Sequence, residues 1–237
     1  MTNTNRRRLL AAGLVAGAAR VGMADLHAEE DGSKEKEVKA VEDLMREHGV
    51  LRRALFVYTT AAARLRSGKG KVPPDALMRT AQLFRSFGED YHERMLEEQY
   101  VFPALAGAKG PVGPLPDVLK FQHERGRAIN DYVTVVTRAG SISSGNARPL
   151  ADALDGLVLM YRQHAAIEDT VVFPAWKEVV SAKEYDELTD RFEDLEHQMF
   201  GKDGFNDAVA RIAAIEESLG IANLAAVTAP IPPKPLP

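Results

Sequence analysis

Cysteine is absent from the 237 residues of this chain. Disulfide scaffolds, thiolate zinc sites, iron–sulfur clusters and cysteine nucleophiles are therefore excluded, and any metal must be held by histidine and carboxylate side chains. A glycine-rich phosphate loop, a Ser-His-Asp arrangement and a basic surface interleaved with aromatic residues are also missing. No stretch alternates β-branched and polar residues between turn signals, so we expect no β-sheet.

The N-terminus lacks an apolar run long enough for a membrane anchor. The basic cluster Arg6-Arg7-Arg8 leads into the apolar stretch 9–19, and Gly22-Met23-Ala24 follows as a cleavage site. That stretch has about half of the ~20 residues that a spanning helix requires. We interpret 1–24 as a twin-arginine export signal, which predicts a periplasmic or exported protein without a stable anchor after cleavage. A disordered basic tail is the alternative.

Cleavage would also change the charge of the chain. Residues 1–24 contain four arginines and no acid, so cleavage after Ala24 moves the formal charge from −4 to −8. An acidic protein binds nucleic acid poorly, and we expect no such partner. The twin-arginine route resembles one used by proteins that fold around a cofactor before export, so metal could be loaded in the cytoplasm.

The 45% hydrophobic composition is enough for one sizeable domain. Apolar residues spaced by three and four positions indicate helices, and turn and capping signals divide them. We expect long helices from 38 to a break at 67–74, from 75 to about 103, over 117–138 and over 149–176, with a polar loop at 141–148. Shorter helices are expected over 182–197 and 203–219. The predicted organisation is a linker at 25–37, a four-helix bundle at 38–200, a C-terminal helix at 201–220 and an irregular proline-rich tail at 221–237.

A histidine pattern occurs twice along these helices. His48 is followed 44 residues later by His92, and His123 is followed 41 residues later by His164. Each second histidine precedes a glutamate and a Phe-Pro pair, and each glutamate lies five residues before its phenylalanine. Two imidazoles and one carboxylate per half, on segments long enough to be antiparallel helices, are what a two-metal site inside a four-helix bundle needs.

In the second half, His164 and Glu168 are four residues apart and share a helical face, so both can reach one metal. Asp169 is a weaker alternative to Glu168. In the first half, His92 and Glu97 are five residues apart, roughly 140° around an ideal α-helix. Either this helix contains a single π-bulge or a neighbouring residue replaces the ligand.

We favour Glu97, because it keeps the offset from Phe102 that Glu168 keeps from Phe173. Glu93 is the alternative or an additional ligand, and His197 is a secondary candidate that has no counterpart in the other half. Each histidine alone would usually be a core or surface residue. Their repeated spacing favours metal instead, and the predicted ligands are His48, His92, Glu97, His123, His164 and Glu168. The mixture of imidazole and carboxylate favours a di-iron centre, with manganese or zinc as second choices.

Other polar residues near these blocks have two interpretations. Tyr91, Tyr100 and Tyr161 lie beside the predicted ligands and could donate hydrogen bonds or electrons there, or simply pack in the bundle. Arg52-Arg53, Arg85 and Arg94 are interpreted as solvated faces.

With these histidine blocks the chain resembles the hemerythrin-like, HHE cation-binding family. The resemblance is carried by Glu47-His48, by Tyr91-His92 through Phe102-Pro103, by Gln122-His123 through Arg127, and by Tyr161 through Pro174. It implies an all-α, up-down four-helix bundle holding a non-haem di-iron centre that binds O2 or a related small oxidant. In respiratory members the third helix carries a second histidine four residues after the first, and Arg127 stands there in this chain. That departure indicates a site richer in carboxylates, for example with Glu93, or coordination by water.

Two classes of function fit this pattern. In the first, the iron centre binds O2 or a small oxidant for sensing, storage or carriage. In the second, it is a di-iron enzyme acting on peroxide, nitric oxide or ferrous iron. The order of histidine before glutamate differs from the Glu-x-x-His pattern of ferritin-like oxidases and favours binding. A zinc bundle whose ion only stabilises the fold is a poorer alternative.

Overall fold

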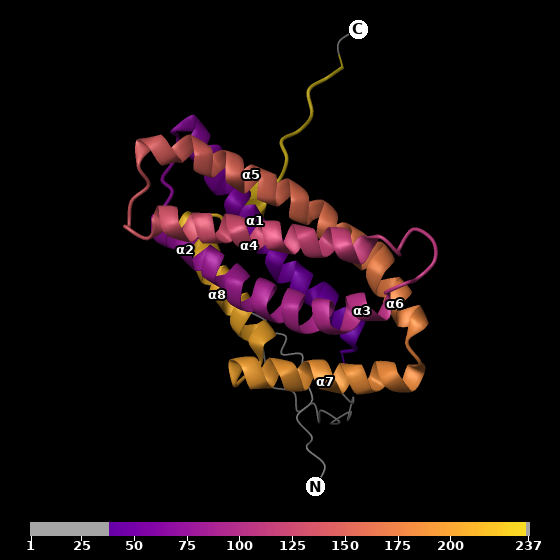
Figure 1. The fold of residues 1–237 in the computed structure, drawn as a ribbon. Helices are drawn as coiled ribbons and strands as arrows, with labels where there is room; N and C mark the ends of the chain where they lie inside the picture. The colour runs from indigo at the N-terminus through magenta and orange to yellow at the C-terminus, as the bar shows by residue number, and fades with distance from the viewer. Residues whose placement is uncertain (1–37, 236–237) are drawn as a thin grey trace, which may run out of the picture.

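The computed structural model describes residues 38–235 of the chain. The predicted export signal and the whole of the predicted linker lie outside the described residues, and so do the last two residues of the tail. Across the described part the ordered elements are helical and none is a strand, which confirms the all-α expectation (Figure 1). No helix in residues 38–235 has both the length and the apolar composition that a membrane crossing needs.

Four long helical rods form the bundle (Figure 1). The first is α1 (Ala40–Ser67) and the third is α4 (Leu115–Thr137). The second is a continuous rod of α2 (Pro74–Leu83), η1 (Phe84–Val101) and α3 (Phe102–Ala104). The fourth is a continuous rod of α5 (Ser144–Ile167), η2 (Glu168–Val172) and α6 (Phe173–Val179). Helices α7 (Ala182–Phe200) and α8 (Gly204–Leu219) follow, and the 3₁₀ turn η3 (Leu224–Val227) interrupts an otherwise irregular tail.

The fourth rod begins earlier than the sequence predicted. Residues 144–148, expected in a polar loop, form the first turn of α5. The reason is a capping contact, because the Ser143 hydroxyl accepts a hydrogen bond from the Asn146 backbone N–H at 3.3 Å. This bond satisfies one of the amides that a helix start leaves unpaired. Pro149 is accommodated inside the helix rather than at its start.

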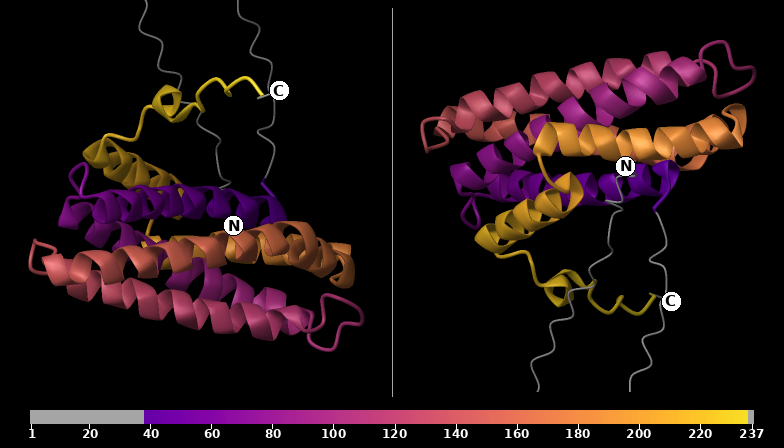
Figure 2. Two further views of the ribbon diagram at one scale, coloured as in Figure 1. Left: turned by 90° about the horizontal axis from the view of Figure 1, so that it is seen from above. Right: turned by 90° about the horizontal axis from the view of Figure 1, so that it is seen from below.

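The two C-terminal helices cover part of the bundle. Helix α8 packs against α1 and α2, and α7 contacts α1 and η1. Figure 2 shows α8 and α4 on opposite sides of the bundle. Aromatic rings hold α7 in place: Trp176 of α6 stacks on Phe192 of α7 with ring centroids 5.9 Å apart, and Tyr91 of η1 meets Phe200 edge-on at 5.3 Å. Such pairs add to the stabilisation gained by burying the rings.

Two segments of the rods are π-helical, with hydrogen bonds from residue i+5 back to residue i. The Phe102 N–H donates to the Glu97 carbonyl, and the Phe173 N–H donates to the Glu168 carbonyl. A proline, which has no backbone N–H to donate, follows each phenylalanine, and the rods continue through it as α3 and α6. Segment η1 is 18 residues long, so the π-helical region is longer than the single π-bulge that the sequence suggested. Within it, the five-residue step from His92 to Glu97 is about one turn.

Candidate metal centre

The six side chains predicted as ligands come together in the core of the bundle. They arise from five elements, with His48 on α1, His92 and Glu97 on η1, His123 on α4, His164 on α5 and Glu168 on η2. All six are buried, with at most 4% of any residue exposed. They fall into two overlapping groups of possible ligand atoms, one of His48, His92 and Glu97 and one of Glu97, His123, His164 and Glu168, and a third group joins His123 to Glu93 and Glu98.

The four imidazoles form two pairs. Nε2 of His48 lies 3.0 Å from Nε2 of His92, and Nε2 of His123 lies 3.1 Å from Nε2 of His164. Each pair joins the first histidine of one sequence repeat to the second histidine of the same repeat. The pairs therefore define two neighbouring half-sites, one from each half of the repeat.

Two glutamates bridge these half-sites. Glu97 places Oε1 3.3 Å from Nε2 of His92 and Oε2 3.4 Å from Nε2 of His123. Glu168 places a single oxygen, Oε2, 3.4 Å from Nε2 of His48 and 3.0 Å from Nε2 of His164. Each carboxylate thus contacts both pairs, which is the arrangement that two bridged ions require.

The outer nitrogen of every imidazole is held by an oxygen acceptor. Nδ1 of His48 donates to Asp169 at 2.7 Å, and Nδ1 of His123 donates to Glu98 at 2.9 Å. A carboxylate can only accept, so Nδ1 carries a proton, and Nε2 is the nitrogen that faces the centre and becomes a donor when a metal displaces its proton. Such acceptors orient metal-ligating histidines and make their nitrogens more basic.

The other two acceptors come from the residues that precede His48 and His123. Nδ1 of His92 donates to Glu47 at 2.6 Å, and Nδ1 of His164 donates to Gln122 at 2.9 Å. Sequence reasoning did not assign roles to these two residues or to Glu98. The signal was present, because each acceptor occupies the same offset in both halves: one residue before the first histidine, or one residue after the bridging glutamate.

Two arginines complete the repeat. Arg52 lies four residues after His48 and donates to Asp169, while Arg127 lies four residues after His123 and donates to Glu98 at 2.6 Å. Each arginine therefore binds the carboxylate that holds its own histidine. The interpretation of Arg52 as a merely solvated residue was incomplete, since its exposed side chain is also paired. Arg127 does not replace the missing histidine as a ligand, because a guanidinium has no lone pair to offer.

The secondary candidates have other contacts. Both oxygens of Glu93 are engaged, Oε1 by the Tyr161 hydroxyl at 2.6 Å and Oε2 by Arg127 at 3.1 Å, and Glu93 also belongs to the third group of possible ligand atoms, with His123 and Glu98. Asp169 holds His48 from outside and is in none of the three groups of ligand atoms. His197 is on α7, where its Nδ1 contacts the Glu193 carbonyl of the same helix at 3.0 Å, and the structure does not bring it into the groups.

Of the three tyrosines, Tyr161 contacts the site through its hydroxyl. Its hydroxyl reaches Glu93 by passing over α4 at Gly126, where a Cβ would lie 2.1 Å from the hydroxyl oxygen. Tyr91 packs against Phe87 and Phe200, as expected for a bundle residue.

This close approach predicts a large effect of Gly126→Ala. The Tyr161 ring lies between Phe84 and His164 and has little room to move, so we expect a loss of roughly 1–3 kcal/mol, as for other overpacked cores. Gly156→Ala is the matched control in α5, where an added Cβ meets nothing within 4 Å, and it should stabilise by about 0.5–1 kcal/mol. Urea unfolding of both variants measures the difference, and a gain of stability for Gly126→Ala would contradict the close packing.

Burial lowers the pKa values of the imidazoles, and the neighbouring carboxylates raise them. Burial lowers the pKa of His123, but Glu93, Glu97 and Glu98 outweigh it and raise that pKa to about 10. Burial likewise lowers the pKa of His48, and Asp169 and Glu168 more than compensate. The carboxylates thus attract positive charge to the Nε2 positions. A metal ion competes with protons for these nitrogens, so it should bind more tightly as the pH rises.

The donor set fits a metal because its oxygens face the imidazole nitrogens and lack well-formed hydrogen bonds. None of the four carboxylate oxygens of Glu97 and Glu168 makes a hydrogen bond to any described residue, although all are buried. Buried carboxylates without partners are costly. Four imidazole nitrogens and two bridging carboxylates form a mixed set suited to first-row transition metals.

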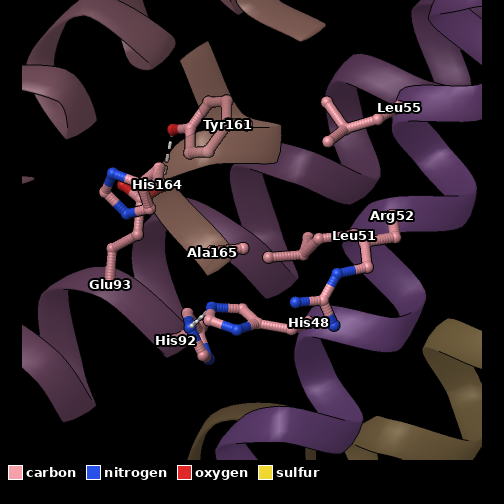
Figure 3. A pocket seen from close by; sticks show the side chains of 9 residues that line it. All are labelled: His48, Leu51, Arg52, Leu55, His92, Glu93, Tyr161, His164 and Ala165. Carbon is pink, nitrogen blue, oxygen red and sulfur yellow. Dashed lines mark hydrogen bonds between the residues drawn. The ribbon is translucent and has the colours of Figure 1, made fainter. Parts of the chain in front are cut away.

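A small cavity of about 10 Å³ adjoins the two imidazole pairs (Figure 3). Its walls combine ligand histidines His48, His92 and His164 with the apolar side chains of Leu51, Leu55 and Ala165, and with Arg52, Glu93 and Tyr161. This volume is about the minimum that holds one water molecule, so the cavity marks a place beside the centre for a ligand of about that size.

Comparison with known proteins agrees with this geometry. Residues 39–176 match the family model described as the hemerythrin HHE cation-binding domain. The chain is 45% identical over 196 residues to uncharacterized proteins of Mycobacterium tuberculosis, Rv1995, and of Mycobacterium bovis, Mb2018, covering 82% of this chain and 76% of each relative. No solved structure shows significant similarity to the chain. With more than half of its length matched by the model, the chain belongs to the hemerythrin HHE cation-binding family.

Proposed function

We propose that this protein holds a non-haem di-iron centre and binds O2 or a related small oxidant there. The observation that carries the proposal is the symmetry of the donor set. Two imidazole pairs face the core, and Glu97 and Glu168 each contact both pairs through oxygens that have no hydrogen bonds. A single ion would leave one pair and part of each bridge without a partner, so two ions use the set fully.

Iron is the metal that we favour. Imidazole suits several transition metals, whereas carboxylates favour harder ions, and a bridged mixture of both is suited to two iron ions. Manganese and zinc are the second choices. When bound, iron supplies a coordination position for a small ligand and the electrons that such ligands exchange.

The chain's own residues prepare that position. Nδ1 hydrogen bonds fix the orientation of all four imidazoles, which limits movement of the donors. Leu51, Leu55 and Ala165 line one side of the cavity and disfavour bulk water there. A small neutral molecule such as O2 can occupy an apolar space of this kind at little desolvation cost.

A catalytic role is the second candidate, with peroxide, nitric oxide or ferrous iron as substrate. The observation in its favour is the polar wall of the cavity, where the Tyr161 hydroxyl donates to Glu93 at 2.6 Å (Figure 3). A hydroxyl proton beside the bound ligand suits reactions that consume protons. A purely structural zinc site is less well supported, because such sites are usually closed and this one adjoins a cavity.

Export is a separate part of the proposal. The twin-arginine pattern at 1–24 favours a periplasmic or exported protein, loaded with metal before transport and free of nucleic-acid partners. Secretion of a reporter fused to these residues, compared with an Arg7→Lys, Arg8→Lys variant, would test that part alone.

Metal analysis of aerobically purified protein tests the function. We expect about two iron ions per chain, following the two half-sites, and a visible absorption band that changes when O2 is removed under argon and returns in air. His197→Ala is the matched control, since that histidine lies outside all three groups of ligand atoms. Iron below one ion per chain after anaerobic reconstitution, or zinc retained in preference to iron, would contradict the di-iron assignment. Peroxide turnover by the loaded protein would favour the catalytic candidate.

A further inference from the structure

Arg52 has an unusual place among the residues that line the metal cavity. Eight of the nine lining residues described by the structure are buried, and Arg52 is the exposed one, with 44% of its side chain accessible. Figure 3 shows its guanidinium extending toward His48. The cavity therefore comes closest to solvent at this side chain.

On its outer side Arg52 lines a second hollow. This surface groove has a volume of about 510 Å³ and lies between α1 and the segment that follows α8. Arg52 is the residue that the groove and the cavity have in common, since the other lining residues of the groove are Arg53, Phe56, Glu216, Ile221, Ala222, Leu224 and Val227.

We propose that Arg52 is the gate through which small ligands pass from this surface groove to the metal cavity. The inference rests on the proposed function, because it concerns access to the same centre. Movement of one side chain would join the two spaces, whereas any other path must displace residues that are almost wholly buried. Side chains at exposed positions change rotamer rapidly, so such a gate can open without unfolding the bundle.

The contact that closes the gate is the ion pair of Arg52 with Asp169. With 44% and 18% of the two side chains exposed, the pair is screened by solvent and contributes little to stability. Asp169 is also the acceptor for His48, so it stays in place when Arg52 swings away. The gate can thus open while the imidazole keeps its orientation.

The equivalent arginine of the other half is fixed instead. Only 12% of the Arg127 side chain is exposed, and it binds both Glu93 and Glu98. Arg127 does not line the cavity. The repeat therefore supplies two arginines with the same contact to a carboxylate, and burial makes one of them immobile and leaves the other able to move.

Ligand-binding rates of the iron-loaded full chain test the gate. We would measure stopped-flow association and dissociation of azide with the ferric protein and of nitric oxide with the ferrous protein. For Arg52→Ala we expect both rate constants to rise by roughly two- to fivefold for both probes, the range in which losing a partly exposed ion pair shifts an opening equilibrium. The nitric oxide affinity should change little, because a gate acts on both directions equally.

Two further variants sharpen the test. Arg53→Ala is the matched control, since Arg53 lines the groove but not the cavity and pairs with Glu216 at 2.5 Å. It should leave both rates at the wild-type value. Arg52→Lys keeps the charge with a thinner head group and should give intermediate rates.

Unchanged rates in Arg52→Ala with a normal iron content would overturn the gate. Slower azide binding with unaltered nitric oxide binding would also overturn it, since that result would make Arg52 a residue that attracts anions. Failure of the wild-type protein to hold iron is a different outcome, and it would remove the proposed function itself.

Discussion

Replacing Glu168 with alanine is expected to empty the metal centre. One oxygen of this residue lies within 3.4 Å of His48 and 3.0 Å of His164, so its removal takes a donor from both half-sites at once. Loss of a residue that merely orients a ligand already costs about 10–100-fold in metal affinity, and loss of a bridging ligand should cost more. Iron per chain, measured after purification and desalting, should fall close to zero.

The same substitution should lower the thermal stability of the iron-loaded protein. A ligand present at a thousand times its dissociation constant stabilises the folded state by about 4 kcal/mol, which corresponds to a shift of roughly 10 °C for a domain of this size. Calorimetry with and without a chelator separates the contributions. Wild-type protein should lose this increment when iron is removed, whereas Glu168→Ala should change little.

Glu168→Gln serves as a companion variant, because it keeps the volume of the side chain and removes its charge. Iron loss in both variants assigns the effect to the missing carboxylate rather than to a cavity. His197→Ala should retain wild-type iron, as its imidazole lies outside the ligand groups. Full iron occupancy in Glu168→Ala would remove this residue from the site.

The convergence of the four histidines could be anticipated from the sequence because the pattern occurs twice. A single histidine on an apolar helical face has several explanations, but two copies with matching Phe-Pro pairs have few. The choice of Glu97 over Glu93 followed from the same comparison. In the structure Glu97 contacts both imidazole pairs, while Glu93 is engaged by Tyr161 and Arg127.

The length of the π-helical segment could not be anticipated in the same way. A π-helical segment is rare and has no local sequence signature, so the choice of i+5 over i+4 hydrogen bonding depends on packing against the other rods. The sequence marked only one point of conflict, the five-residue step from His92 to Glu97. The structure extends π-type bonding in both directions from that step, over Phe84–Val101.

The polar contacts behind the ligands required the three-dimensional arrangement. Glu47 precedes His48 in the chain yet holds His92, and Gln122 precedes His123 yet holds His164. Each acceptor therefore serves the histidine of the neighbouring rod rather than its own neighbour in sequence. Helix periodicity predicts which face a residue occupies, but not which partner on the next helix it meets.

Glu89 is a buried carboxylate that no pattern in the sequence marked, and it should make stability depend on pH. It is fully buried one turn before Glu93, where Oε1 accepts from the Asn130 amide at 2.7 Å and Oε2 lies 3.0 Å from Nε of Arg85. Burial is the main cause that raises its pKa to about 7, with Glu93 adding to it, while Asn130 and the arginines act in the opposite direction.

The sign of the pH dependence follows from the two protonation states. In the unfolded chain this carboxyl has its ordinary pKa of 4.5, so between pH 4.5 and about 7 the folded protein binds more protons than the unfolded chain. Stability from this group is present below pH 4.5 and is lost as the pH rises toward 7. At about 1.4 kcal/mol per pKa unit, the loss is about 3 kcal/mol.

Glu89→Gln removes that loss, because an amide keeps an oxygen for Asn130 and cannot ionise. Urea unfolding at pH 5 and pH 8 should show the variant gaining about 3 kcal/mol on the wild-type protein between the two conditions. Glu89→Ala should show the same gain with pH but lie lower at both values by about 1–3 kcal/mol, since it leaves the Asn130 amide unpaired in the core. The histidines titrate in all three proteins, so their contribution cancels from the comparison. Parallel pH profiles for wild type and Glu89→Gln would mean that Glu89 stays ionised in the folded bundle, held by Arg85 more strongly than burial opposes it.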